Sequence, residues 1–87
     1  TFIKFDITGG NHTLTSTPTI ATSGAVEGQM VILMNVDAAD HIILQQGATY
    51  ALSLSNSSHK IDPGGSIVLV FDGTYWVEIA YTLKTSI

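Results

Sequence analysis

The stretch 66–81, SIVLVFDGTYWVEIAY, decides the fold class of this chain. It contains two runs rich in β-branched and aromatic residues, 66–71 and 75–81, which are separated by Asp72 and Gly73. Runs of this composition are typical of strands. Asp-Gly between two apolar runs favours a hairpin with a two-residue type I′ turn. The stretch therefore predicts a pair of antiparallel strands.

Similar runs precede this hairpin along the chain. Further strands are predicted at residues 2–8, 12–15, 29–36, 41–45 and 49–54. Turns are predicted as a hairpin loop at 36–40, a tight turn at 46–48 and a Pro-Gly turn at 62–65. Val, Ile and Thr fill 27 of the 87 positions, and no window repeats apolar residues at a helical period over three turns. The pattern indicates an all-β fold, either a small antiparallel β-sandwich or a barrel-like meander.

Two of the predicted strands, 30–34 (MVILM) and 67–71 (IVLVF), are apolar on both faces. A small antiparallel domain has only one core, which covers one face of each sheet. Other copies of the chain are the leading source of a second layer, so we predict a homo-oligomer; the alternative is a two-sheet monomer whose inner strands are well buried. The predicted interface residues are Met30, Ile32, Met34, Val68, Val70 and Trp76.

Length and composition exclude several classes of protein. The 87 residues are enough for one β-domain, spanning residues 1–87, and only 11% of them are charged, against about 25% in a typical soluble domain. With a net charge of −4 and no arginine, the chain has no basic stripe for nucleic acid. No apolar run approaches the ~18 residues of a membrane span. Because the chain opens on Thr1, we interpret it as an excised piece of a longer protein.

The sequence contains no set of residues that predicts catalysis. Most aspartates lie at predicted turns, where their side chains ordinarily bond to the backbone. His12, His41 and His59 match no metal motif, and cysteine is absent. We interpret these histidines as surface or strand-end residues; a single histidine repeated around a three-fold axis is the alternative. The expectation is a protein that is not an enzyme and has no metal or cofactor.

The aromatic residues raise the question of a binding site. Strand alternation places Trp76 and Glu78 on one face. The opposite face is predicted to carry Tyr75, Val77, Ile79 and Tyr81. A tryptophan beside a carboxylate can stack a sugar ring and accept its hydroxyls, so Trp76, Glu78, Tyr50 and Asn56 form a candidate glycan site, with Ser57 beside it. The favoured alternative is that Trp76 belongs to the core or to an interface.

Two local motifs resemble a known family. Residues 26–35 (VEGQMVILMN), 41–47 (HIILQQG) and 66–80 (SIVLVFDGTYWVEIA) resemble the small C-terminal domains of bacteriophage tail fibres and tailspikes, which are receptor-binding proteins. The motifs are Gly28-Gln29 before an apolar strand and D-G-x-x-W at 72–76, and the resemblance spans residues 26–80.

The resemblance implies a homotrimeric β-domain at the end of a virion fibre that acts outside the cell. Such a domain joins three chains, supports host attachment, and in some members contacts bacterial surface polysaccharide. Two other classes stay open: a carbohydrate-binding module, and a monomeric β-sandwich accessory module of a secreted enzyme.

Overall fold

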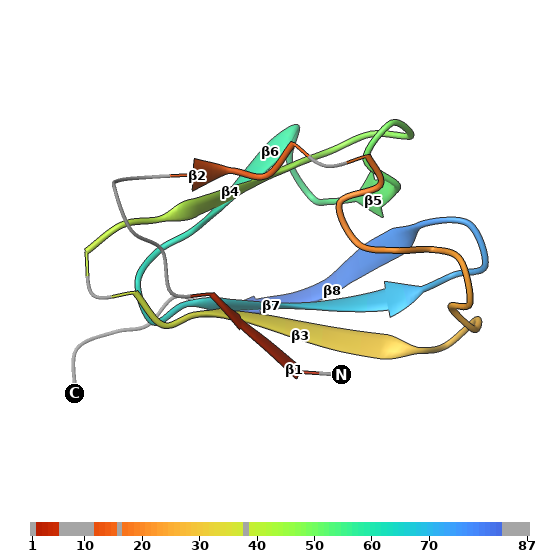
Figure 1. The fold of residues 1–87 in the computed structure, drawn as a ribbon, viewed down its shortest axis with the longest axis horizontal. Helices are drawn as coiled ribbons and strands as arrows, with labels where there is room; N and C mark the ends of the chain where they lie inside the picture. Colours follow the sequence, from red (N-terminus) through yellow and green to blue (C-terminus); the bar gives the residue numbers. More distant parts are fainter. Residues whose placement is uncertain (1, 6–11, 16, 38, 83–87) are drawn as a thin grey trace.

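The computed structural model describes residues 2–5, 12–15, 17–37 and 39–82, which form eight strands and no helix (Figure 1). The strands are β1 (Phe2–Phe5), β2 (His12–Thr13), β3 (Met30–Asn35), β4 (Ile42–Gln45), β5 (Leu52–Ser53), β6 (Ser58–Ile61), β7 (Ser66–Phe71) and β8 (Trp76–Thr82). The all-β prediction is confirmed. Of the predicted first strand, residues 6–8 lie outside the described residues.

Two sheets make up the domain. The large sheet has the order β1-β3-β7-β8-β5 and the small sheet has the order β2-β4-β6. Figure 1 shows the small sheet lying over one face of the large sheet, which is the layering of a β-sandwich. The β3–β7, β7–β8 and β4–β6 pairs are antiparallel, but β1–β3, β2–β4 and β5–β8 are parallel. The prediction of an antiparallel fold is therefore wrong in part, because the short strands β1, β2 and β5 each add in parallel to a later strand.

The segment after β3 crosses from the large sheet to the small sheet. The prediction of a hairpin loop at 36–40 is wrong, because β3 and β4 belong to different sheets. Asn35 is fully buried at this crossing and donates its side-chain amide to the carbonyls of Asp40 (2.9 Å) and Ile61 (3.0 Å). Its side-chain oxygen accepts the Asp37 amide at 2.9 Å. These bonds satisfy a buried amide and turn the chain between the layers.

The connection from β6 to β7 also changes sheets. The predicted Pro-Gly turn is confirmed here: the Gly65 amide donates to the Asp62 carbonyl at 2.8 Å, and Gly64 has a φ of +80°. A positive φ at this position is favourable for glycine and costly for a residue with a Cβ. The turn brings β7 back under the small sheet.

The region before β6 differs from the prediction. The strand predicted at 49–54 is reduced to Leu52–Ser53, because residues 48–51 form a turn that is closed by a bridge between Gly47 and Leu52. Strand β6 was not predicted, since Ser58 and Lys60 face solvent and only His59 and Ile61 point inward. A strand with a single inward aliphatic side chain carries a weak apolar signal.

The predicted β7–β8 hairpin is present, with a longer connection than expected. Phe71 pairs with Trp76, so the chain turns over four residues. A type I′ turn needs a positive φ at both central residues, and of the Asp72-Gly73 pair only Gly73 has one, at +103°. The Asp72 carboxylate instead accepts the amides of Tyr75 (2.7 Å) and Thr74 (2.8 Å), and these bonds lower the pKa of Asp72.

The core lies between the two sheets. Its buried side chains are Val31, Leu33, Leu44, Leu52, Ile61, Ile67, Leu69, Phe71 and Trp76. Trp76 is only 2% exposed, and its ring centroid lies 5.1 Å from that of Phe71 in a tilted arrangement. The interpretation of Trp76 as a core residue is confirmed.

A β-bulge interrupts β8. Val68 pairs with Ala80, whereas the next residue, Leu69, pairs with Glu78, so Ile79 is an extra residue on the bulged strand. The bulge resets the alternation of the strand. Tyr81 therefore points inward with Glu78, and the prediction that Tyr81 faces away is wrong.

Candidate functional site

The side of strands β3, β7 and β8 that faces away from the small sheet is apolar, and we call it the outer face. It is formed by outward side chains of β3, β7 and β8: Met30, Ile32, Met34, Val68, Val70, Val77, Ile79 and Ala80. The ladder aligns these residues in rows across the sheet, one of which joins Met30, Val70 and Val77. The outward residues of these three strands include no charged side chain.

The outer face is exposed to solvent in the single chain. Met30 is 47% exposed and Ile79 is 55% exposed, while Ile32, Val68 and Val70 are half-buried. No described segment of the chain forms a second layer over these residues. A contiguous exposed apolar patch of this kind marks an interaction surface.

The opposite side of the sandwich has a different character. Outward residues of the small sheet are Thr13, Ile43, Gln45, Ser58 and Lys60. Hydroxyl, amide and ammonium groups are well hydrated in such positions, so this surface needs no cover. The domain is therefore two-sided, with one apolar and one polar sheet surface.

A polar cluster joins the two sheets inside the sandwich, and we call it the inter-sheet cluster. His59 of β6 lies 3.1 Å from Glu78 of β8, measured from Nε2 to Oε2, and the two side chains are 9% and 10% exposed. The backbone amide and the hydroxyl of Ser55 both donate to Glu78 Oε1, at 2.9 and 3.0 Å. The carboxylate thus accepts bonds at both oxygens, as a buried charge requires.

Tyr81 completes the inter-sheet cluster. Its ring lies against the imidazole of His59, with ring centroids 3.9 Å apart, and its hydroxyl donates to the Lys60 carbonyl at 2.6 Å. Burial raises the pKa of Tyr81, and the negative charges of Asp62 and Glu78 raise it further. The cluster links β8 to β6 along one side of the sandwich.

The raised pKa of Tyr81 predicts an alkaline loss of stability. Because the fold favours the neutral phenol, this contribution is fully present below the ordinary tyrosine pKa of about 10 and is lost as the pH rises through the higher folded value. We expect the urea midpoint to fall in that range. In the Tyr81→Phe variant the fall should be smaller, and an equally steep fall would contradict the prediction.

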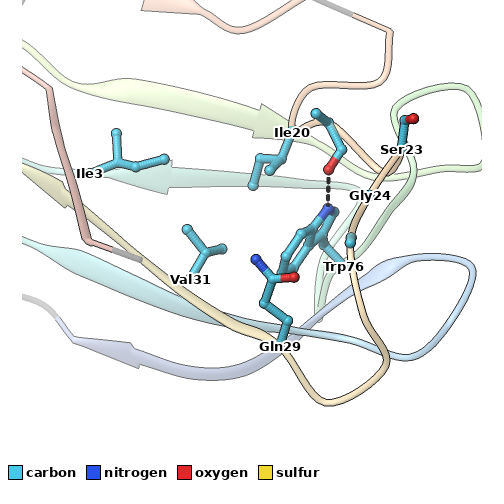
Figure 2. A pocket seen from close by; sticks show the side chains of 9 residues that line it. Ile3, Ile20, Ser23, Gly24, Gln29, Val31 and Trp76 are labelled. Carbon is cyan, nitrogen blue, oxygen red and sulfur yellow. Dashed lines mark hydrogen bonds between the residues drawn. The ribbon is translucent and has the colours of Figure 1, made fainter.

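A crevice lies at one end of the sandwich, beside Trp76 (Figure 2). Its volume is about 240 Å³, and Ile3, Ile20 and Val31 supply apolar walls. The Trp76 indole donates Nε1–H to the Ala21 carbonyl at 3.3 Å. The described residues that line the crevice carry no charge.

The structure separates the predicted glycan-site residues. Trp76 and Glu78 point into the sandwich, Tyr50 is half-buried and packs against the core, and Asn56 is exposed in the loop before β6. These side chains do not share one surface. Of the predicted interface residues, Met30, Ile32, Met34, Val68 and Val70 do share the outer face, whereas Trp76 lies in the core.

The interpretation of the histidines is wrong for His59, which is 7% exposed and lies in the middle of β6. Its neighbours Ser58 and Lys60 alternate with it in a period of two, and this is the signal that could have shown an inward histidine. Within the described ranges, no group of three or more histidine, cysteine or acidic residues is placed to hold a metal. Those ranges also contain no helix that is long and apolar enough to span a membrane.

These features define a small two-layer β-sandwich with an uncovered apolar sheet face and a mostly apolar interior that contains one polar cluster. The family model described as the phage depolymerase C-terminal beta sandwich domain matches residues 5–77. The chain belongs to this family, which confirms the resemblance to phage tail fibre and tailspike domains and makes it a domain of a virion tail component. No curated protein and no solved structure matches the chain.

Proposed function

We propose that this domain joins copies of its chain into a trimer and caps the C-terminal end of a phage tail fibre or tailspike, where it supports host attachment outside the cell. The outer face is the observation that carries the proposal. Its eight apolar residues lie on one side of the large sheet, without a charged side chain among them and without a second layer. A neighbouring copy would remove this surface from water.

The free energy gained by burying apolar surface supports self-association. Burial of apolar area contributes about 25 cal/mol per Å², and a domain of this size has only a small core of its own. Self-association adds a second buried face to each copy. The stability of such a domain then depends on protein concentration.

The side chains of the interior support a structural role for the domain. Within the described residues the interior is filled with aliphatic and aromatic side chains, and its buried acid, Glu78, is fully occupied by His59 and Ser55. An engaged carboxylate is not free to act as a general base. We therefore propose that the domain itself carries out no catalysis.

A charge on the outer face should prevent assembly. Val70 pairs with both Met30 and Val77 in the middle of this face, so the Val70→Asp variant would bury an unpaired carboxylate between copies. We expect the dissociation constant to rise by at least about 100-fold, equivalent to about 3 kcal/mol. Light scattering coupled to size exclusion would measure the mass of each species.

Ser58→Asp is the matched control, since Ser58 is exposed on the solvent-facing side of the small sheet, opposite the outer face. This variant should assemble like the unmodified chain. Assembly that is unchanged in Val70→Asp, or lost equally in both variants, would contradict the proposal.

A further inference from the structure

The β-bulge in β8 places two consecutive side chains on the outer face. Ile79 and Ala80 are consecutive residues, and both are exposed on the outer face opposite Val68. In a regular strand one of them would have pointed inward. Ile79 is 55% exposed, so the bulge adds a branched apolar side chain to a surface that already lacks cover.

The interior contacts of β8 explain how the bulge is held in place. Glu78 bonds to His59 and Ser55 before the bulge, and Tyr81 bonds to the Lys60 carbonyl after it. Both side chains point inward although they are three positions apart. The inter-sheet cluster therefore fixes Ile79 and Ala80 on the outer face.

The outer face has two different sides, separated by the central strand β7. The β3 flank consists of Met30, Ile32 and Met34. The β8 flank consists of Val77, Ile79 and Ala80. One flank has long, adaptable side chains, and the other has a projecting side chain beside a small one. Methionine side chains adjust readily to the shape of a partner surface.

A closed ring of copies with three-fold symmetry uses heterologous contacts, in which two different patches of one molecule meet. The partner of an uncharged apolar flank should itself be uncharged and apolar. The small-sheet surface does not meet this requirement, because it presents Ser58 and Lys60. The other flank of the outer face does meet it.

We propose that the β8 flank of one copy packs on the β3 flank of the next copy, with Ile79 inserted against Met30 and Ile32. The inference rests on the proposed self-association and adds to it the direction of the contact and the residue that fixes it. The partner is a second copy of this chain. The bulge is then the element that presents Ile79 to this contact.

Disulfide trapping tests this contact, because the chain contains no cysteine. Strands β3 and β8 are separated by β7, so Ile79 and Met30 lie about 9.5 Å or more apart within one copy. A disulfide requires Cα atoms within about 7 Å. A bond in the Ile79→Cys/Met30→Cys double variant must therefore join two copies.

We expect the oxidised double variant to give covalent dimers and trimers on a non-reducing gel. Neither single variant should give them, and neither should the control pair Ile79→Cys/Ser58→Cys. Dimers from Ile79→Cys alone would show a two-fold contact and overturn the inference. A double variant that has trimeric mass but forms no disulfide would also overturn it, whereas a mass of one copy for the unmodified chain would instead refute the proposed function.

A second comparison does not depend on oxidation. Ile43 points outward on the small sheet, on the opposite side of the sandwich, so it is a matched control for Ile79. Ile79→Ala should raise the dissociation constant by at least about tenfold, while Ile43→Ala should leave it unchanged. Equal effects of the two substitutions would contradict a specific role of Ile79.

Discussion

The Trp76→Ala variant is expected to lose most of the stability of the domain. Trp76 is 2% exposed, contacts Phe71 and bonds to the Ala21 carbonyl, so its removal leaves a large cavity between the sheets. Truncation of a buried aromatic residue costs about 3–5 kcal/mol, against about 5–15 kcal/mol for a whole domain. Urea unfolding followed by circular dichroism would measure the loss.

Trp76→Phe is the control for this prediction. It keeps an aromatic ring in the core and removes only the indole bond and part of the ring volume, so the loss should be much smaller. Glycan-binding assays on the same variants test the alternative function. If Trp76→Ala kept its urea midpoint and its oligomeric mass but lost affinity for a polysaccharide, Trp76 would be a ligand residue and the core assignment would be contradicted.

Breaking the inter-sheet cluster should have the next largest effect. In His59→Leu the Glu78 carboxylate stays buried without its imidazole partner, and loss of one member of a buried pair costs about 3–5 kcal/mol. In Glu78→Leu the donors of His59 and Ser55 lose their acceptor, which costs about 1–3 kcal/mol for each unsatisfied group.

The double variant His59→Leu/Glu78→Leu distinguishes a coupled pair from two independent residues. Replacement of both members removes the unpaired charge, so the double variant should be more stable than the sum of the two single losses predicts. The four urea curves form a double-mutant cycle. Additive losses would show that His59 and Glu78 do not interact.

The sequence predicts best those features whose signals are local. The β7–β8 hairpin follows from two apolar runs around Asp72-Gly73, and strand alternation groups Met30, Ile32 and Met34 on one face of their strand. Such features depend on residues that are close in the chain or that share a strand. They need no knowledge of what packs against them.

Features that depend on partners distant in the chain were missed. Strand β6 pairs with β4, and its inward residue His59 contacts Glu78, which is 19 positions away. No local pattern encodes that contact. Asn35 directs the chain between sheets through carbonyls of Asp40 and Ile61. The role of Asn35 depends on contacts made only when the two sheets are packed together, so the sequence does not reveal it.

The bulge in β8 shows how one extra residue changes which side chains of a strand point inward. Strict alternation from Trp76 sends Tyr81 outward, but the extra residue at Ile79 returns Tyr81 to the interior. The contacts of Glu78 and Tyr81 with the small sheet decide the bulge. Two consecutive outward apolar residues, Ile79 and Ala80, are its consequence on the outer face.

The solution mass of the unmodified domain tests the central claim, that copies associate through the outer face. Light scattering during size exclusion would measure it over a range of concentrations, with a heat-denatured sample as the reference for separate chains. We predict a mass near three times 9.2 kDa that persists on dilution. A folded species of 9.2 kDa at all concentrations would contradict the claim.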